Sequence, residues 1–167
     1  VLSSDNNGHS MLSFMLTQYD GSVEPQFYPY DCFSINNPDE EFAAYAADMV
    51  QCNKNLIIAC KGKDGETGTV YYLNDKTFVL ENKLTAPEYP DFKPEAMGIP
   101  GNGLVGNSYP IVCTGGKVYE FSVTEGAIVK AEKFQSTYSL PTAVYTDKSP
   151  NYYSVFMWEK EIGGLSL

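Results

Sequence analysis

Short apolar segments rich in β-branched and aromatic residues recur along the chain and predict β-strands. Glycine, asparagine, aspartate and proline separate them, and turns as short as residues 114–117 favour antiparallel hairpins. The pattern therefore predicts an all-β fold with antiparallel sheets. The clearest predicted strands are residues 70–73, 78–80, 111–113, 118–121 and 153–158.

One segment has a helical pattern instead. Asn37 is a suitable N-cap, Pro38 suits the first helical position, and residues 39–41 place acids in the first turn. Apolar side chains then recur at helical spacing, which predicts one short helix near 38–50. These apolar residues are Phe42, Tyr45, Ala46, Met49 and Val50.

An internal repeat links two strand-rich parts of the chain. Each copy has an apolar strand, a glycine turn and a strand that begins with Val-Tyr, and residues 56–72 align with 110–121. The copies continue alike, since 78–84 matches 128–134. In this alignment Ile57 corresponds to Ile111 and Val70 to Val118, and weaker copies start near residues 11 and 153.

Unit starts near 11, 56, 110 and 153 give a spacing that is typical of β-propeller blades, which repeat about every 40 to 50 residues. We therefore predict a single β-propeller-type domain or fragment over residues 1–167; the alternative is a β-sandwich whose hairpins resemble one another. The sequence holds about three and a half units, whereas propellers close with at least four blades. Either a strand before Met11 completes the last blade, or other blades or chains complete the propeller.

Charge and histidine content narrow the possible functions. The net charge is −10, and all 11 cations are lysine because the chain has no arginine. Nucleic acids and anionic bilayers bind clustered Lys and Arg, so we expect no nucleic-acid partner. Apolar stretches are far shorter than the roughly 18 residues of a spanning helix, so we expect no membrane span. With His9 as the single histidine, a His-rich metal shell is excluded.

The four cysteines form no CxxC pair of the kind used by zinc or redox sites. Cys60 and Cys113 each end an apolar run, where a free thiol behaves as a small hydrophobe. We expect both to be reduced and buried, because equivalent positions on separate blades lie too far apart for a disulfide.

Two stretches carry a resemblance to a known family. The strand, turn and Val-Tyr pattern at 57–72 and 111–121, and the segment 152–165, are similar to the propeller-like C-terminal regions of PKD-like surface lipoproteins of Bacteroidota-type bacteria. The resemblance covers roughly residues 50–167 at the level of pattern. It implies an extracellular or outer-surface protein of a glycan-uptake or adhesion system, with a lipidated N-terminus and an immunoglobulin-like PKD domain upstream.

Tyrosines near loops are the candidate ligand-binding residues, because sugar C–H faces stack on exposed rings. Tyr89 and Tyr138 follow the matched strands 78–84 and 128–134 at comparable distances, so we predict that both project from one end of the blades. Most other aromatic residues are expected to pack between blades. Trp158 ends an apolar strand and is expected in the core.

No catalytic, cofactor or metal motif stands out. The turns at Asp5, Asp20 and Asp64 supply oxygen ligands but complete no calcium loop, and GxSxG, HExxH and P-loop strings are absent. We therefore expect no cofactor and predict a non-catalytic surface or secreted module that binds carbohydrate or a partner protein. The alternatives are a carboxylate-dependent glycoside-active enzyme and a purely structural part of a larger surface assembly.

Overall fold

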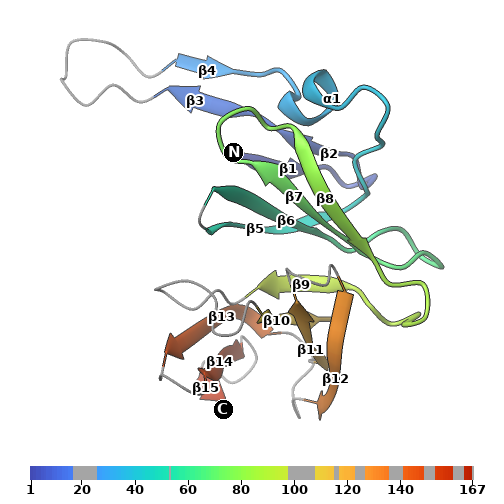
Figure 1. Cartoon of the computed structure of the whole chain (residues 1–167), viewed down its shortest axis with the longest axis vertical. Helices are drawn as coiled ribbons and strands as arrows, with labels where there is room; N and C mark the ends of the chain where they lie inside the picture. The colour runs from blue at the N-terminus through green and yellow to red at the C-terminus, as the bar shows by residue number, and fades with distance from the viewer. Residues whose placement is uncertain are drawn as a thin grey trace.

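The computed structural model describes residues 1–16, 26–52, 54–97, 108–114, 117–122, 127–135, 141–148, 153–159 and 164–166. Within these ranges the chain consists of antiparallel strands and one short helix (Figure 1). The prediction of an all-β fold with antiparallel, blade-like repeats is confirmed. No helix in the described part of the chain has the length and apolarity to span a bilayer.

We number the sheets in chain order. The second and third sheets have the same four-stranded meander, in which each strand pairs with the next one along the chain. This is the strand order of a propeller blade, and three strands of the same kind follow near the C-terminus. The second sheet contains β5 (Ala46–Cys52), β6 (Asn55–Cys60), β7 (Thr69–Asn74) and β8 (Leu80–Thr85). The third contains β9 (Pro94–Met97), β10 (Ser108–Cys113), β11 (Lys117–Ser122) and β12 (Ala127–Gln135), and the fourth contains β13 (Pro141–Lys148), β14 (Tyr153–Glu159) and β15 (Gly164–Ser166).

The N-terminal strands form two ladders that share one stretch of chain. β1 (Leu2–Ser4) pairs with β2 (Ser10–Leu12), and β3 (Phe14–Leu16) pairs with β4 (Gln26–Tyr28). Only Ser13 separates β2 from β3, so we call these four strands together the first sheet.

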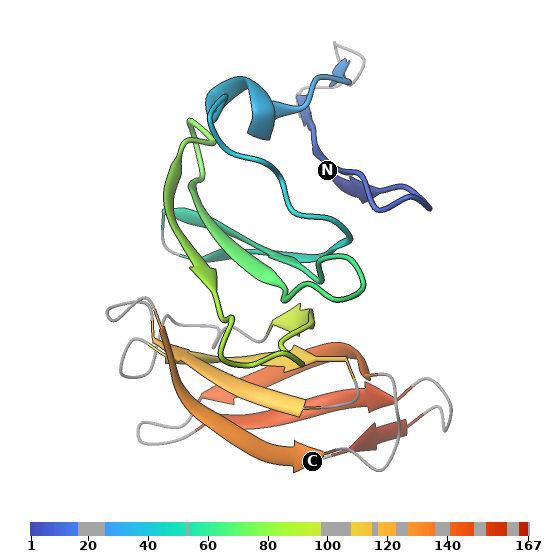
Figure 2. The ribbon, with the colours of Figure 1, turned by 90° about the vertical axis from the view of Figure 1, so that its right-hand side faces the viewer.

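The first strands of successive sheets lie side by side. β1 contacts β5, β5 contacts β9, and β9 contacts β13. Figure 2 shows the sheets stacked in chain order, with the first and fourth at opposite ends of the molecule. This series is how propeller blades place their inner strands around an axis. That the whole chain is one domain stays a prediction.

Strand pairing corrects the sequence alignment of the repeat by one residue. Val70 pairs with Ala59 and Val118 pairs with Val112, so Cys60 is equivalent to Cys113 and Ile58, not Ile57, is equivalent to Ile111. β6 and β10 also hold the second position of their sheets, since the sheets begin with β5 and β9. A bulge in the first pair of each sheet lies at the same register, next to the partners of Cys60 and Cys113.

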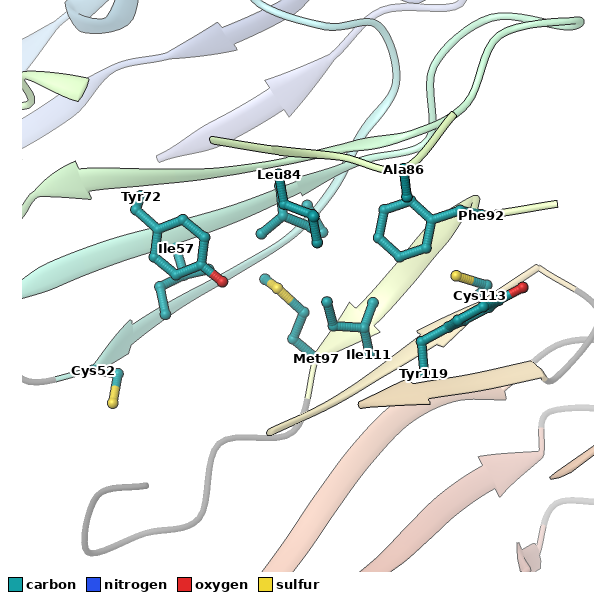
Figure 3. Packing of buried hydrophobic residues seen from close by; sticks show 12 residues of the cluster. Cys52, Ile57, Tyr72, Leu84, Ala86, Phe92, Met97, Ile111, Cys113 and Tyr119 are labelled. Atoms are coloured by element: carbon teal, nitrogen blue, oxygen red, sulfur yellow. The ribbon is translucent and has the colours of Figure 1, made fainter. Parts of the chain in front are cut away.

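The second sheet is buried on both faces. We call the face toward the following sheet the forward face and the face toward the preceding sheet the rear face. The forward face of the second sheet contributes Ile57, Val70 and Leu84 to a core that Ile111 and Tyr119 complete from the rear face of the third sheet (Figure 3). The rear face of the second sheet contributes Ile58 and Leu73 to another core with the first sheet.

The one helix is not at 38–50. It is α1 (Cys32–Asn36), with Asp31 as N-cap, whereas residues 46–52 form β5. Asn37, the expected N-cap, is instead the C-cap, and its buried amide donates to the carbonyls of Phe33 and Phe78 and accepts from the Leu80 amide. Tertiary hydrogen bonds and ladder pairing with β6 therefore override the local helical pattern.

Candidate functional site

Loops and inter-sheet segments meet at one end of the sheets. β5 and β9 begin there and β6 and β10 end there, because Cys60 pairs with Ala46 and Cys113 pairs with Pro94. The connector 86–93 runs from β8 to β9 at this end, and the loop 61–68 joins β6 to β7 there. We call it the connector end.

Hydrogen bonds fasten neighbouring segments of the connector end to one another. The Gly68 amide donates to the Phe92 carbonyl at 2.6 Å, and Lys93 Nζ donates to the Lys63 carbonyl at 2.6 Å. Lys61 forms an ion pair with Glu95, whose side chain is only 10% exposed. The loop of one sheet is thereby held against the first strand of the next, which gives this end a fixed shape.

Two equivalent tyrosines hold the segments that lead into the second and third sheets. Tyr71 Oη donates to the Glu41 carbonyl at 2.9 Å and accepts from the Ala43 amide at 2.9 Å. Tyr119 Oη donates to Asp91 Oδ1 at 2.7 Å. Burial raises the pKa of Tyr71 to about 12 and also raises the pKa of Tyr119.

Aromatic rings surround both tyrosines in the same way. Phe33 and Phe42 contact Tyr71 edge to face, at centroid distances of 5.1 and 5.5 Å. Tyr89 and Phe92 contact Tyr119 edge to face at 5.4 and 5.5 Å. Such pairs contribute about 0.5–1.5 kcal/mol each beyond area burial. The segments that lead into the second and third sheets are therefore each ordered by an equivalent aromatic cluster.

Tyr45 differs from these buried rings because it is exposed and its backbone is strained. It precedes β5 at the connector end, its residue is 37% exposed, and its φ is +57°. A bulky residue in the left-handed region costs on the order of 1–3 kcal/mol. Its amide donates to the Gly8 carbonyl and its carbonyl accepts from the Lys61 amide, both at 3.0 Å. These bonds fix Tyr45 in the unfavourable conformation.

Gly8 is required beneath the Tyr45 ring. A Cβ at Gly8 would lie 2.8 Å from Tyr45 Cε2, and Gly8 itself has φ +86°. Both space and backbone conformation therefore demand glycine here. The turn that carries Gly8 and the strained Tyr45 form one unit.

Polar side chains lie in the same turn. Asp5 Oδ1 accepts from the amides of Asn7 and His9 at 2.8 and 2.9 Å, and Asp5 Oδ2 lies 2.9 Å from His9 Nδ1. The hydrogen bond from the His9 side chain is the largest cause that lowers the pKa of Asp5. Both side chains are exposed, at 51% for Asp5 and 78% for His9. The turn that carries Gly8 thus presents exposed hydrogen-bonding groups.

The residues proposed from sequence have different outcomes. Tyr89 lies in the connector between β8 and β9, and its half-buried ring packs against the core that contains Tyr119. Tyr138 lies outside the described residues. Trp158 lies in β14, paired with Ala143 and Leu165. A ligand role for Tyr89 and Tyr138 stays a prediction.

All four cysteines are free and buried. Burial raises the pKa of Cys60 to about 12, raises that of Cys113 as well, and keeps both thiols in their unreactive protonated form. The prediction that Cys60 and Cys113 are reduced and buried is confirmed.

Sequence reasoning missed Tyr45 because it was assigned to the face of a helix. The internal repeat in the sequence contains a signal that identifies the position of Tyr45. Extended backward by one strand, the alignment sets 46–52 beside 94–97 and places Tyr45 where a connector enters a sheet.

No family model and no curated protein matches the chain. Among solved structures, the chain is similar to the β-propeller domain of Cps50 (Swd1) from Myceliophteria thermophila, with a TM-score of 0.46 and 13% sequence identity, covering 71% of this chain and 34% of that one. The chain thus spans about a third of the length of that domain.

Proposed function

We propose that this chain is a non-catalytic binding module of the extracellular space or outer cell surface, and that it binds neutral carbohydrate at the connector end. The observation that carries the proposal is the exposed ring of Tyr45, held over Gly8 by a left-handed backbone conformation. Strained residues persist where the surrounding structure fixes them, and they cluster at ligand sites.

The chemistry around the ring suits a sugar. A tyrosine face stacks on sugar C–H groups, and its hydroxyl offers a hydrogen bond at a wet edge. Asp5 and His9, in the turn that also carries Gly8, add exposed acceptor and donor groups for sugar hydroxyls. A chain with a net charge of −10 and no arginine favours a neutral glycan over an anionic one.

The test is a glycan-array screen followed by affinity measurement with the best neutral oligosaccharide on Tyr45→Gly. Glycine adopts φ +57° without strain, so Tyr45→Gly is expected to keep the melting temperature while affinity falls about tenfold or more, which is about 1.4 kcal/mol. Tyr45→Phe keeps the ring and is expected to keep most of the affinity. Tyr30→Ala removes another exposed tyrosine ring, from a residue that is 63% exposed, and serves as the control.

Several outcomes contradict the proposal. The glycan proposal is wrong if no neutral glycan binds, or if Tyr45→Gly binds as tightly as the unchanged chain. If the chain instead captures a protein in a way that depends on Tyr45, and binds no glycan, the same surface binds a partner protein. Cleavage of the bound oligosaccharide, detected by product analysis, would contradict the non-catalytic assignment.

A further inference from the structure

Backbone hydrogen bonds and one ion pair form a continuous row across the connector end. The Tyr45 amide donates to the carbonyl of Gly8, in the turn between β1 and β2, at 3.0 Å. The Lys61 amide donates to the Tyr45 carbonyl, also at 3.0 Å. Lys61 Nζ then forms an ion pair with Glu95 of β9. The row therefore crosses the first, second and third sheets in order.

Side chains from the middle of this row reach in opposite directions. The Tyr45 ring lies against Gly8, on the side of the first sheet, whereas Lys61 Nζ reaches Glu95, on the side of the third sheet. Hydrogen-bonded neighbouring strands lie about 4.7–4.9 Å apart, and the two side chains diverge from such a pair of neighbours. A ligand that contacts both the ring and the ammonium group must therefore be longer than one sugar ring.

The ion pair offers hydrogen bonds on one side and has no net charge. The Lys61 side chain is 37% exposed, whereas that of Glu95 is 10% exposed. An ammonium group has three donors, so Lys61 can donate to a ligand hydroxyl while it keeps its bond to Glu95. Hydrogen bonds from a charged donor are stronger than those between neutral groups. A neutral pair with an exposed donor suits the hydroxyl of an uncharged sugar.

The backbone beside Lys61 is held in place as firmly as that of Tyr45. The Gly62 amide donates to the Ala44 carbonyl at 3.0 Å. Gly62 has φ +72°, and a Cβ there would lie 2.7 Å from the carbonyl oxygen of Thr67. Both contact points are thus fixed before a ligand binds, which lowers the entropy that binding costs.

We propose that the ligand is a neutral oligosaccharide of at least two sugar units that lies across this row, with one unit on the Tyr45 ring and a further unit hydrogen-bonded by Lys61. Lys61 contacts the ligand, and Glu95 is a positioning residue that holds the ammonium group. This inference rests on the proposed function and extends it from a single exposed ring to two subsites.

The test is an NMR titration of the unchanged chain with cello-, xylo-, manno- and malto-oligosaccharides of one, two and three sugar units. In the series that binds, affinity is expected to rise about tenfold or more from the single sugar to the longer chains, because only the longer chains reach Lys61.

A double variant then assigns that gain to Lys61. Lys61→Met together with Glu95→Gln removes the ammonium group and leaves no unpaired carboxylate. It is expected to reduce the affinity for the longer chains to that for the single sugar, and to leave the affinity for the single sugar unchanged. Lys83→Met together with Glu40→Gln is the matched control, because Lys83 is similarly exposed, at 44%, but lies on β8. The control should keep the gain with length.

The outcomes separate this inference from the proposed function. If no sugar of any length binds, the proposed function is wrong, and this inference with it. If the single sugar binds as tightly as the longer chains, or if the Lys61 double variant keeps the gain with length, only the second subsite is wrong. An equal loss at every length gives the ion pair a purely structural role and also contradicts the subsite. The length series on the unchanged chain decides the question even if a variant fails to fold.

Discussion

At the scale of single residues, the repeated tyrosines Tyr71 and Tyr119 explain how short connectors are held in place. Each sits on the rear face of its sheet and bonds the segment that leads into that sheet. The Val-Tyr repeat in the sequence predicted that these residues are equivalent. It could not show what their hydroxyls bind, because Glu41, Ala43 and Asp91 lie about 28–30 positions away.

Removing the two hydroxyls is expected to have unequal effects. Tyr71→Phe removes both a donor and an acceptor and leaves the Ala43 amide without its bond, so we expect a loss of about 1–2 kcal/mol. Tyr119→Phe removes one bond to Asp91, which is 44% exposed and keeps its ion pair with Lys117, so we expect about 1 kcal/mol or less. Urea unfolding measures both; a larger loss for Tyr119→Phe would contradict the assignment.

The raised pKa of Tyr71 predicts a loss of stability in alkali. The pKa of Tyr71 in the folded chain, about 12, lies above the ordinary tyrosine value of about 10, so the unfolded chain releases this proton first as the pH rises. The contribution is complete below about pH 10 and is lost as the pH rises toward 12. Unfolding free energies across this window are expected to fall less steeply in Tyr71→Phe. An unchanged slope would show that Tyr71 does not titrate as its burial indicates.

At the scale of elements, the sequence identified strands well and the helix poorly. Alternating apolar residues and glycine turns are local signals, and they located β7, β10, β11 and β14. The helical pattern at 38–50 was local too, but the backbone there pairs with β6. The real helix, α1, spans only five residues, which is too short for a periodic signal.

Substitution of two aspartates tests whether the helix lies at 32–36 or at 38–50. Asp31 caps α1 by accepting from the Phe33 amide, and it also accepts from the Leu12 amide in β2. Asp31→Ala is therefore expected to cost about 1–2 kcal/mol. Asp39→Ala removes an exposed carboxylate from the segment that was predicted to start the helix, and we expect no measurable change. Chemical denaturation with the opposite ranking would support a helix at 38–50.

Gly68 marks the contact between the second and third sheets. A Cβ there would lie 2.3 Å from Pro94 Cδ and 2.6 Å from the Cys60 carbonyl oxygen. Gly68→Ala must push the connector off the sheet, so it is expected to cost more than Gly65→Ala, where the added Cβ meets nothing within 4 Å and only backbone strain is incurred. Thermal unfolding ranks the two variants. A tolerated Gly68→Ala would mean that the loop and connector are not held together.

At the scale of the whole molecule, the repeat in the sequence indicated blades, and the pairing of strands shows how they join. The unit starts expected near 56, 110 and 153 coincide with β6, β10 and β14, the second strands of their sheets. The predicted units therefore begin one strand late. First strands such as β9 have only four residues, so their local sequence signal is weak. Which residues lie on which face of a sheet follows from register, and one residue of misalignment exchanges the two faces.

The central claim is that the two faces of the second sheet belong to separate cores. The rear face shares a core with the first sheet, and the forward face shares a core with the third. A double-mutant cycle tests it directly. Leu84 lies on the forward face of the second sheet in the same core as Ile111, and Figure 3 shows the two side chains on opposite sides of that core. Leu73, in the neighbouring strand, belongs to the other core.

The measurement is the interaction energy between Ile111→Ala and either Leu84→Ala or Leu73→Ala, from urea unfolding of the single and double variants. Our account predicts a coupling of about 0.5 kcal/mol or more for the Leu84 pair, because both truncations open the same core. It predicts additivity within about 0.5 kcal/mol for Leu73, whose side chain packs on the opposite face. Additive Leu84 and coupled Leu73 would contradict the arrangement of the sheets.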